Sequence, residues 1–247
     1  MSRLSRLRKR ANDSSRPVFR QAFDDLLDGW SVSADHRDKR RDQTSYSQFG
    51  EDKLLRSLLP ERFGTYVDIG AGHPVRNSNT YYFYKRGWRG VLIEANPQLC
   101  KLLSKTRRRD KTINALVDES ASDETKIWFF EPSELSTADE ARANDLLRQG
   151  VSLREIKSLP SITLRDLSIK VSPEDPSLLS IDVEGLDLRV LRGNDWARFS
   201  PRVICVEVGL NSDSEIDDLL KSLGYEKVGQ QFVSAIFVHF SAVKRSE

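Results

Sequence analysis

The chain is poor in cysteine and in long apolar runs, and both deficits limit what it can be. Its 247 residues include two cysteines, Cys100 and Cys205, with no CxxC pair or metal-ligand spacing. A disulfide-held secreted fold is therefore unfavoured, and a reducing compartment is expected. No apolar run approaches the ~20 residues that a membrane-spanning helix needs. Because the amino terminus also lacks the apolar segment of a secretory signal, we expect a cytoplasmic protein, although its Arg- and Ser-rich composition also suits an organelle transit peptide.

The sequence also has no large excess of positive or negative residues. The sequence has 39 Lys and Arg against 37 Asp and Glu, a net charge of +2, so specific nucleic-acid binding is not expected. Residues 1–42 are the exception, with eleven basic and seven acidic residues. We expect residues 1–44 to form a basic extension and linker, either solvated or in peripheral contact with an anionic membrane. A short helix predicted over 19–30 presents aromatic residues that would suit an oligomer contact.

From residue 45 onward, strand-like and helix-like segments alternate. This order predicts a doubly wound, mostly parallel sheet in one domain over 45–247, ending in a hairpin around Gln231. Polar residues 132–160, with a helical piece at 138–149, are expected to form a lid or substrate-facing insertion. The expected strands cover 65–69, 90–94, 112–117, 126–131, 178–182 and 203–208. The expected helices cover 53–59, 77–86, 97–106, 162–167, 185–191 and 215–220.

The segment from Tyr66 to Gly72 carries the clearest signal. An apolar strand reaches Asp68 and is followed by Gly70 and Gly72, and the next strand ends in Glu94. This is the first half of a nucleotide-binding α/β unit, in which glycines allow close backbone approach and the acid can accept the hydroxyls of a ribose. A glycine turn that serves packing alone would have the same sequence pattern.

Acids follow the expected strands at the edge where such sheets bind ligands. They are Asp68, Glu94, Asp118, Asp182 and Glu207. A cleft rimmed by carboxylates suits a cationic cofactor without phosphate, such as S-adenosylmethionine, better than a dinucleotide. The third glycine of a dinucleotide fingerprint is also absent, since residue 75 is valine. An NAD-dependent oxidoreductase and a non-catalytic binding module remain the alternatives.

Several longer motifs together resemble the FkbM-type S-adenosylmethionine-dependent methyltransferases. They are YSQFGED (46–52), YVDIGAGHP (66–74), SNT (78–80), FYKRGWRGVLIEANP (83–97), LLSIDVEGLDLRVLRG (178–193) and PRVICVE (201–207). The resemblance implies a Rossmann-like methyltransferase fold and methyl transfer to a hydroxyl of a sugar, glycan or polyketide-type product. The sequence departs from the common motif at His73 and Pro74 and in its basic amino terminus.

The resemblance also implies roles for individual residues. The methionine end of the cofactor would lie against Asp68, Gly70 and Gly72, and Glu94 would bind the ribose. The remaining expected cofactor neighbours are Asn96 and Asp118 near the adenine, Gln48, Glu51 and Asn79 closing the pocket, and Ala71, Ala95 and Asp182 beside these.

Four residues are candidates for catalysis: His73, Asp182, Glu184 and Glu207. In one scheme, His73 or Asp182 removes the proton of the acceptor hydroxyl. In the other, Asp182 and Glu207 bind Mg²⁺ or Mn²⁺, which polarises that hydroxyl. Strand alternation would place Glu184 on the same side as Asp182, whereas a structural role at the start of the next helix is equally open. For His73, a structural role is the alternative.

Overall fold

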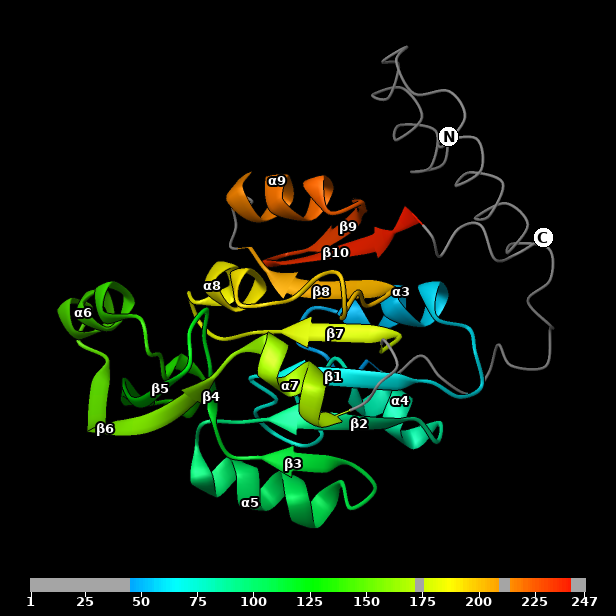
Figure 1. Ribbon diagram of the computed structural model, residues 1–247. Helices are drawn as coiled ribbons and strands as arrows, with labels where there is room; N and C mark the ends of the chain where they lie inside the picture. Colours follow the sequence, from blue (N-terminus) through cyan, green and yellow to red (C-terminus); the bar gives the residue numbers. More distant parts are fainter. Residues whose placement is uncertain (1–44, 172–175, 209–213, 241–247) are drawn as a thin grey trace, which may run out of the picture. The chain divides into compact units, whose positions relative to one another are not determined.

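The computed structural model describes residues 45–171, 176–208 and 214–240 (Figure 1). The expected basic extension over 1–44, with its helix at 19–30, lies outside these residues. In the described part of the chain, no helix combines the length and the apolar character needed to cross a membrane.

The central element is a mostly parallel sheet with the order β3-β2-β1-β7-β8-β10-β9 (Figure 1). Five strands are parallel, and β10 runs antiparallel to both of its neighbours. This confirms the predicted doubly wound fold and its terminal hairpin. The strands are β1 (Thr65–Ile69), β2 (Arg89–Ile93), β3 (Lys111–Ile113), β7 (Leu178–Ile181), β8 (Val203–Glu207), β9 (Tyr225–Gln231) and β10 (Ser234–His239).

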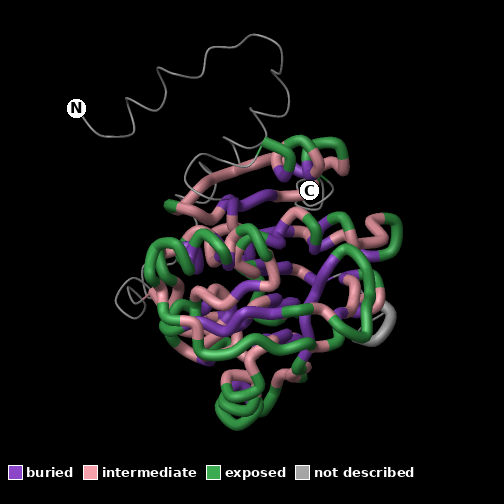
Figure 2. The backbone as a smooth tube through the Cα atoms, turned by 90° about the vertical axis from the view of Figure 1, so that its left-hand side faces the viewer, coloured by how far each residue is buried: buried purple, intermediate pink, exposed green. Residues whose placement is uncertain are grey.

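Helices cover both faces of this sheet because its strands are apolar on both sides. Val67 and Ile69 pack with the helices of one face, whereas Tyr66 packs with those of the other. Figure 2 shows how buried backbone is concentrated in the strands between the two layers. One layer contains α7 (Leu164–Val171), α8 (Asp187–Arg192) and α9 (Ser214–Ser222), and the other contains α3 (Glu51–Leu58), α4 (Tyr81–Lys85) and α5 (Pro97–Thr106).

A second, three-stranded sheet has the order β4-β6-β5 and carries a helix of its own. Trp128 and Phe130 of β5 pack against Ala143 and Leu146 of α6 in a small separate core. The sequence did not predict β6, whose mostly exposed and charged residues resemble a loop. The elements are β4 (Leu116–Val117), β5 (Ser122–Glu131), the 3-10 turn η1 (Ser133–Leu135), α6 (Glu140–Arg148) and β6 (Ser152–Ile162).

The predicted strand over 112–117 is wrong, because the chain divides there between two sheets. β3 pairs with β2, but β4 pairs with β6. Asn114 lies at the break, where its side-chain amide donates to the carbonyl oxygens of Glu94 at 2.7 Å and Ala95 at 2.9 Å. The amide fastens the chain to the end of β2 and lets it turn away from the main sheet.

Candidate active site

A cavity of about 580 Å³ lies where β1, β2 and β7 end. The strand order reverses between β1 and β7, and ligands of doubly wound folds bind beyond the carboxyl ends of strands at such a reversal. The volume is in the range of small-molecule sites. The lining includes residues from the three strand ends, the segment after β3 and the start of the insertion: Gln48, Gly70, Ala71, Gly72, His73, Arg76, Glu94, Ala95, Leu116, Ser133, Glu134, Leu135, Asp182 and Glu184.

The two glycines after β1 differ in function. Gly70 has a φ of 75°, and a Cβ added to it would lie 1.8 Å from the carbonyl oxygen of Asp182. Gly72 has a φ of 57°, but the atom nearest to such a Cβ is 3.8 Å away. Gly70 is therefore glycine because two backbones pack together there. Gly72 leaves open space on the cavity wall, where a ligand can approach the backbone.

Glu94 connects the glycine turn to the end of β2. One carboxylate oxygen accepts a hydrogen bond from the Gly72 N–H at 2.8 Å, and the other accepts one from the Asn96 N–H at 2.7 Å. Burial raises the pKa of Glu94, and the two N–H groups oppose this shift by stabilising the carboxylate. Each oxygen keeps a second lone pair. Glu94 lines the cavity and can therefore accept hydrogen bonds from hydroxyl groups of a ligand.

Asp68 lies behind the glycine turn and does not line the cavity. Strand alternation puts it on the same face as Tyr66, under α4, where it accepts the hydroxyl of Thr80 at 2.5 Å. Thr80 also accepts a hydrogen bond from the fully buried Arg107 at 2.9 Å. Arg107 binds Asp110 at 2.8 Å and the Tyr66 hydroxyl at 2.7 Å. Burial raises the pKa of Asp68, and the Arg107 cation opposes that shift.

Of the other predicted cofactor residues, Gln48, Ala71 and Ala95 line the cavity. Gln48 is exposed, Ala71 is buried behind the turn, and Ala95 directly follows Glu94. Together with Gly70, Gly72, Glu94 and Asp182, they are the predicted cofactor residues that the fold brings to one space.

Four further residues expected near the cofactor make contacts elsewhere and are not part of the cavity lining. Asn96 caps α5 by accepting from the second and third residues of that helix. Asp118 forms an ion pair with Arg189 at 2.8 Å. Glu51 accepts from a backbone N–H at 2.8 Å and from a serine hydroxyl of β10 at 3.2 Å. Asn79 donates to a serine hydroxyl of β7 at 3.2 Å.

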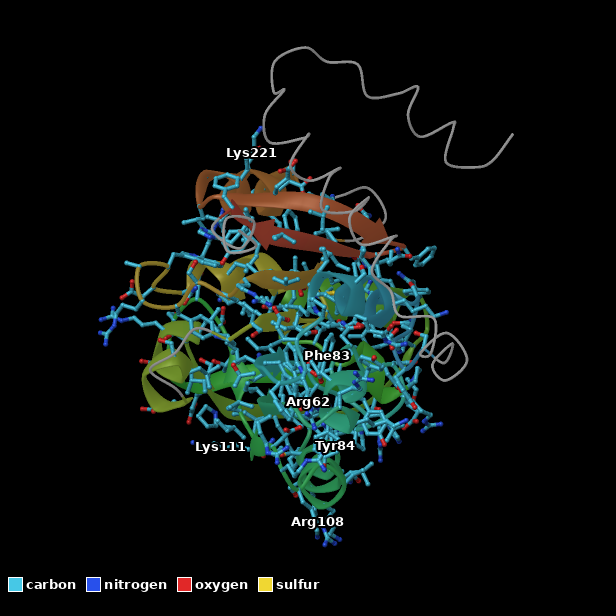
Figure 3. All side chains as sticks on the ribbon, turned by 90° about the vertical axis from the view of Figure 1, so that its right-hand side faces the viewer. Arg62, Phe83, Tyr84, Arg108, Lys111 and Lys221 are labelled. Atoms are coloured by element: carbon cyan, nitrogen blue, oxygen red, sulfur yellow. The ribbon has the colours of Figure 1, made fainter. Side chains whose placement is uncertain are left out.

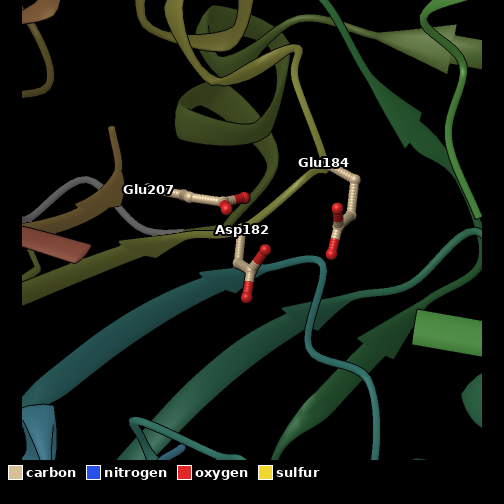
Figure 4. A group of neighbouring side chains, drawn as sticks. All are labelled: Asp182, Glu184 and Glu207. Atoms are coloured by element: carbon tan, nitrogen blue, oxygen red, sulfur yellow. The ribbon is translucent and has the colours of Figure 1, made fainter. Parts of the chain in front are cut away.

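The three predicted catalytic acids converge from the segments that follow β7 and end β8. Ligand atoms of Asp182, Glu184 and Glu207 all lie within 4.8 Å of one another (Figure 4). Asp182 follows β7 and is exposed, whereas Glu184 and Glu207 are partly buried. Strand alternation does not bring Glu184 here, because β7 ends at Ile181 and Glu184 has a left-handed φ of 53°. The turn itself places its carboxylate.

The crowding of acids changes their proton affinities. Although Asp182 has accessible surface toward the open cavity, the surrounding protein desolvates its carboxylate, and together with the nearby Glu207 and Glu184 carboxylates this raises its pKa well above the ordinary value. Burial and the Asp187 carboxylate raise the pKa of Glu207 to about 7, against a hydrogen bond with Asp182 that lowers it. Asp182 and Glu207 are therefore expected to share a proton near neutral pH.

Asp187 is a fourth acid of this group, which sequence reasoning did not single out. It is 4% exposed, and its oxygens face the N–H groups of Val183 at 3.4 Å and Gly185 at 3.3 Å. Burial and the nearby Asp182 raise the pKa of Asp187 to about 8. Asp187, rather than Glu184, is the acid in the first turn of α8. The structural role at the start of this helix, considered above for Glu184, therefore falls to Asp187. Its position five residues after Asp182 in one motif was the available signal.

The insertion contacts the acid cluster through Glu184. Arg142 of α6 forms an ion pair with its carboxylate at 3.4 Å, and the Thr137 hydroxyl donates to its carbonyl oxygen at 2.8 Å. The cavity lining also includes Ser133, Glu134 and Leu135 from the same segment. The insertion thus contributes one wall of the cavity, and a role as a lid or substrate-facing segment stays a prediction.

His73 lines the cavity, but its hydrogen bonds argue against a role as a base. Its Nδ1 accepts from the backbone N–H groups of Val75 at 3.1 Å and Arg76 at 3.0 Å. Burial and the Arg76 cation lower the pKa of His73, which favours the neutral ring. A neutral imidazole that accepts at Nδ1 carries its proton on Nε2. His73 therefore presents a hydrogen-bond donor rather than a free basic nitrogen.

Comparisons with known proteins identify the family of the chain. The family model of the methyltransferase FkbM domain matches residues 68–227. No curated protein matches the chain. Similar solved structures include a TehB-like SAM-dependent methyltransferase from Corynebacterium glutamicum, which is 12% identical, with 89% of this chain and 98% of that chain covered and a TM-score of 0.42.

Two others were solved with S-adenosylhomocysteine. The 1,6-didemethyltoxoflavin-N1-methyltransferase from Burkholderia thailandensis is 13% identical, with 92% of this chain and 91% of that chain covered and a TM-score of 0.39. The O-methyltransferase from Bacillus cereus is 11% identical, with 95% of each chain covered and a TM-score of 0.38. The family match covers more than half of the sequence, from Asp68 at the end of β1 to Lys227 in β9, and the chain belongs to the FkbM methyltransferase family.

Proposed function

We propose that the protein is an S-adenosylmethionine-dependent O-methyltransferase acting on a hydroxyl of a sugar, glycan or related natural product. The observation that carries this proposal is the meeting, in one cavity, of Glu94 beside the open Gly72 backbone with the Asp182 carboxylate. The first pair suits the ribose and methionine parts of a cofactor. The Asp182 carboxylate suits the activation of a hydroxyl group.

The charges of the cavity support S-adenosylmethionine over a dinucleotide. Four acids line it: Glu94, Glu134, Asp182 and Glu184. They would repel a pyrophosphate, whereas a sulfonium and an amine are attracted to them. The NAD-dependent oxidoreductase is accordingly the weaker alternative. When bound, S-adenosylmethionine supplies an electrophilic methyl group.

The acceptor hydroxyl must lose its proton, and the acid pair offers a place for it. Asp182 faces the cavity, and its partner Glu207 has a pKa of about 7. A coupled carboxylate pair with raised pKa values can take up a proton as a general base, and general-base catalysis typically contributes about 10²–10⁴-fold. In this scheme Asp182 accepts the proton, Glu207 stabilises it by hydrogen bonding, and the Nε2–H of His73 orients the acceptor.

A cation scheme uses the same acids differently. The three carboxylates of Asp182, Glu184 and Glu207 are close enough to contact one divalent ion. Oxygen ligands suit Mg²⁺ or Mn²⁺ better than Zn²⁺. Such an ion would keep all three ionised and polarise the acceptor hydroxyl. The two schemes differ in whether turnover requires added metal.

The acceptor class follows from the same charges. An acceptor bearing phosphate or carboxylate groups near the reacting hydroxyl would be repelled by this wall, whereas neutral hydroxyl groups can donate to it. Neutral polyhydroxylated molecules are therefore the first acceptors to test. A cytoplasmic location stays a prediction.

Calorimetric titration of the full chain with S-adenosylhomocysteine, with and without Mg²⁺, tests the cofactor. We expect micromolar or tighter binding, and no heat with NADH. Turnover of a hydroxylated acceptor should fall by at least about 100-fold in Asp182→Asn, while affinity for S-adenosylhomocysteine changes less than threefold. Full turnover would remove Asp182 from the mechanism. No binding of S-adenosylhomocysteine would favour a non-catalytic binding module.

A further inference from the structure

A group of exposed basic side chains lies at the amino ends of β1, β2 and β3, opposite the cavity. It contains Arg62, Arg86, Arg89, Arg108, Arg109 and Lys111, and we call it the basic end. Figure 3 views the molecule from this side, with Arg62, Arg108 and Lys111 labelled. The cavity lies at the other ends of the same strands, one strand length away, which is about 16 Å for five residues.

Contacts between the loops show that these residues form one surface. The Arg89 N–H donates to the Gly64 carbonyl at 3.3 Å, which joins the segment before β1 to the start of β2. The ring of Phe63 lies 3.4 Å from where a Cβ on Gly87 would be. The Arg109 guanidinium donates to the carbonyl of Tyr84, which ties the segment after α5 to α4.

The charge of the basic end is not neutralised within the described part of the chain. None of its six side chains forms an ion pair there, and their side-chain hydrogen bonds go to backbone carbonyls. The nearby acids already have basic partners. Glu61 binds Arg202 at 2.6 Å, and Asp110 binds the buried Arg107 at 2.8 Å. The surface therefore attracts anions.

An exposed aromatic ring sits among these cations. Phe63 is 63% exposed, the largest value among the exposed large hydrophobic residues described, and the Arg62 guanidinium lies 5.0 Å from its centroid. A single apolar ring surrounded by basic side chains matches a bilayer interface, where the ring enters the headgroup region and the cations meet anionic lipids. Single-stranded nucleic acid would need open stacking platforms. The neighbouring ring of Tyr84 is covered by Arg109, 4.1 Å from its centroid, and that of Tyr82 by Arg56, 3.7 Å from its centroid.

We propose that the basic end docks on an anionic phospholipid surface, with Phe63 entering the headgroup layer. In this orientation the cavity faces away from the bilayer and stays open to water. The basic residues of 1–42 would add to the attraction, but the proposal rests on the folded surface.

Vesicle co-sedimentation of the full chain at about 150 mM salt tests the proposal. Wild-type protein should bind vesicles of phosphatidylcholine with phosphatidylserine and not vesicles of phosphatidylcholine alone. The test variant reverses four charges of the basic end. The changes are Arg62→Glu, Arg86→Glu, Arg108→Glu and Lys111→Glu. Because each basic residue near an anionic surface strengthens binding severalfold, partitioning should fall more than about 100-fold.

A control variant has the same change in net charge at exposed positions elsewhere. The changes are Arg148→Glu, Arg154→Glu, Lys157→Glu and Lys221→Glu. Charges beyond a screening length of about 8 Å contribute little at this salt concentration, so partitioning should change less than about fivefold. Equal losses in both variants would show a general charge effect and overturn the proposal. If the test variant still binds the vesicles, another segment carries the binding, and the proposal is overturned as well.

The aromatic contribution has its own matched pair. Phe63→Ser should weaken vesicle binding by about 5–20-fold, whereas Phe232→Ser, which replaces a ring that is 58% exposed elsewhere, should not. Thermal unfolding followed by circular dichroism checks that each variant is folded. Preferential binding of a single-stranded oligonucleotide over the anionic vesicles would contradict the lipid assignment.

Discussion

Replacing Glu94 with glutamine tests how the glycine turn and the proposed cofactor pocket depend on one carboxylate. Both oxygens of Glu94 accept backbone N–H groups, from Gly72 at 2.8 Å and Asn96 at 2.7 Å. Glutamine has nearly the same shape, but it offers one oxygen and one NH₂ group. In Glu94→Gln, one backbone N–H must therefore face another donor inside a site that is 8% exposed.

The expected size of the effect follows from these contacts. A hydrogen bond to a charged group contributes about 1.5–3 kcal/mol, and a buried donor left without an acceptor costs a similar amount. We expect the free energy of unfolding of Glu94→Gln to fall by about 1.5–3 kcal/mol. We also expect the dissociation constant for S-adenosylhomocysteine to rise about 10–100-fold, because the ribose loses an ionised acceptor and the Gly72 backbone moves.

Urea unfolding and calorimetric titration measure the two effects separately. Glu119→Gln is the matched control, because this carboxylate is 44% exposed and its ion pair with Arg189 is long, at 3.6 Å. It should change stability by less than about 0.5 kcal/mol. If Glu94→Gln unfolds and binds S-adenosylhomocysteine like the wild type, the role assigned to this residue is refuted. A loss of stability with unchanged affinity would leave Glu94 a structural role alone.

Three further predictions concern the same region. Gly70→Ala should prevent folding, because its Cβ would lie 1.8 Å from a backbone oxygen. Gly72→Ala should lower the free energy of unfolding by about 1–2 kcal/mol and mainly weaken S-adenosylhomocysteine binding. Thermal melts and calorimetry measure the two effects. Arg107→Met should lower the free energy of unfolding in urea by about 3–5 kcal/mol because it strands buried acids, against less than about 0.5 for the exposed neighbour Arg108→Met. Asp187 has a pKa of about 8 when folded and about 3.9 when unfolded, so the folded protein binds the extra proton between these values. Asp187 alone should therefore lower stability by about 3 kcal/mol from pH 5.5 to pH 8.5, and Glu207, whose pKa is about 7, adds a fall of the same sign. Asp187→Asn should remove only the Asp187 share of this slope in urea unfolding.

Much of the core could be predicted because its strands and helices follow from local sequence patterns. The strand at 65–69 and the helix at 97–106 have the predicted bounds. Each is an apolar run with clear local signals, namely a following glycine turn for the strand and a proline in the first turn for the helix. The exchange of partners between Ile113 and Leu116 has no such signal. It depends on an amide that reaches the end of β2, a contact between residues about twenty positions apart.

The candidate site divides in the same way. The doubly wound fold, the glycine turn and the edge at which the acids gather could be predicted from the sequence, because they depend on the order and periodicity of residues. The role of each polar group depends on how the chain folds around it. Strand alternation turned Asp68 to the face under α4, helix capping engaged Asn96, and a left-handed turn brought Glu184 to Asp182. The roles of such groups depend on partners distant in the sequence, and only the folded chain brings those partners within hydrogen-bonding distance.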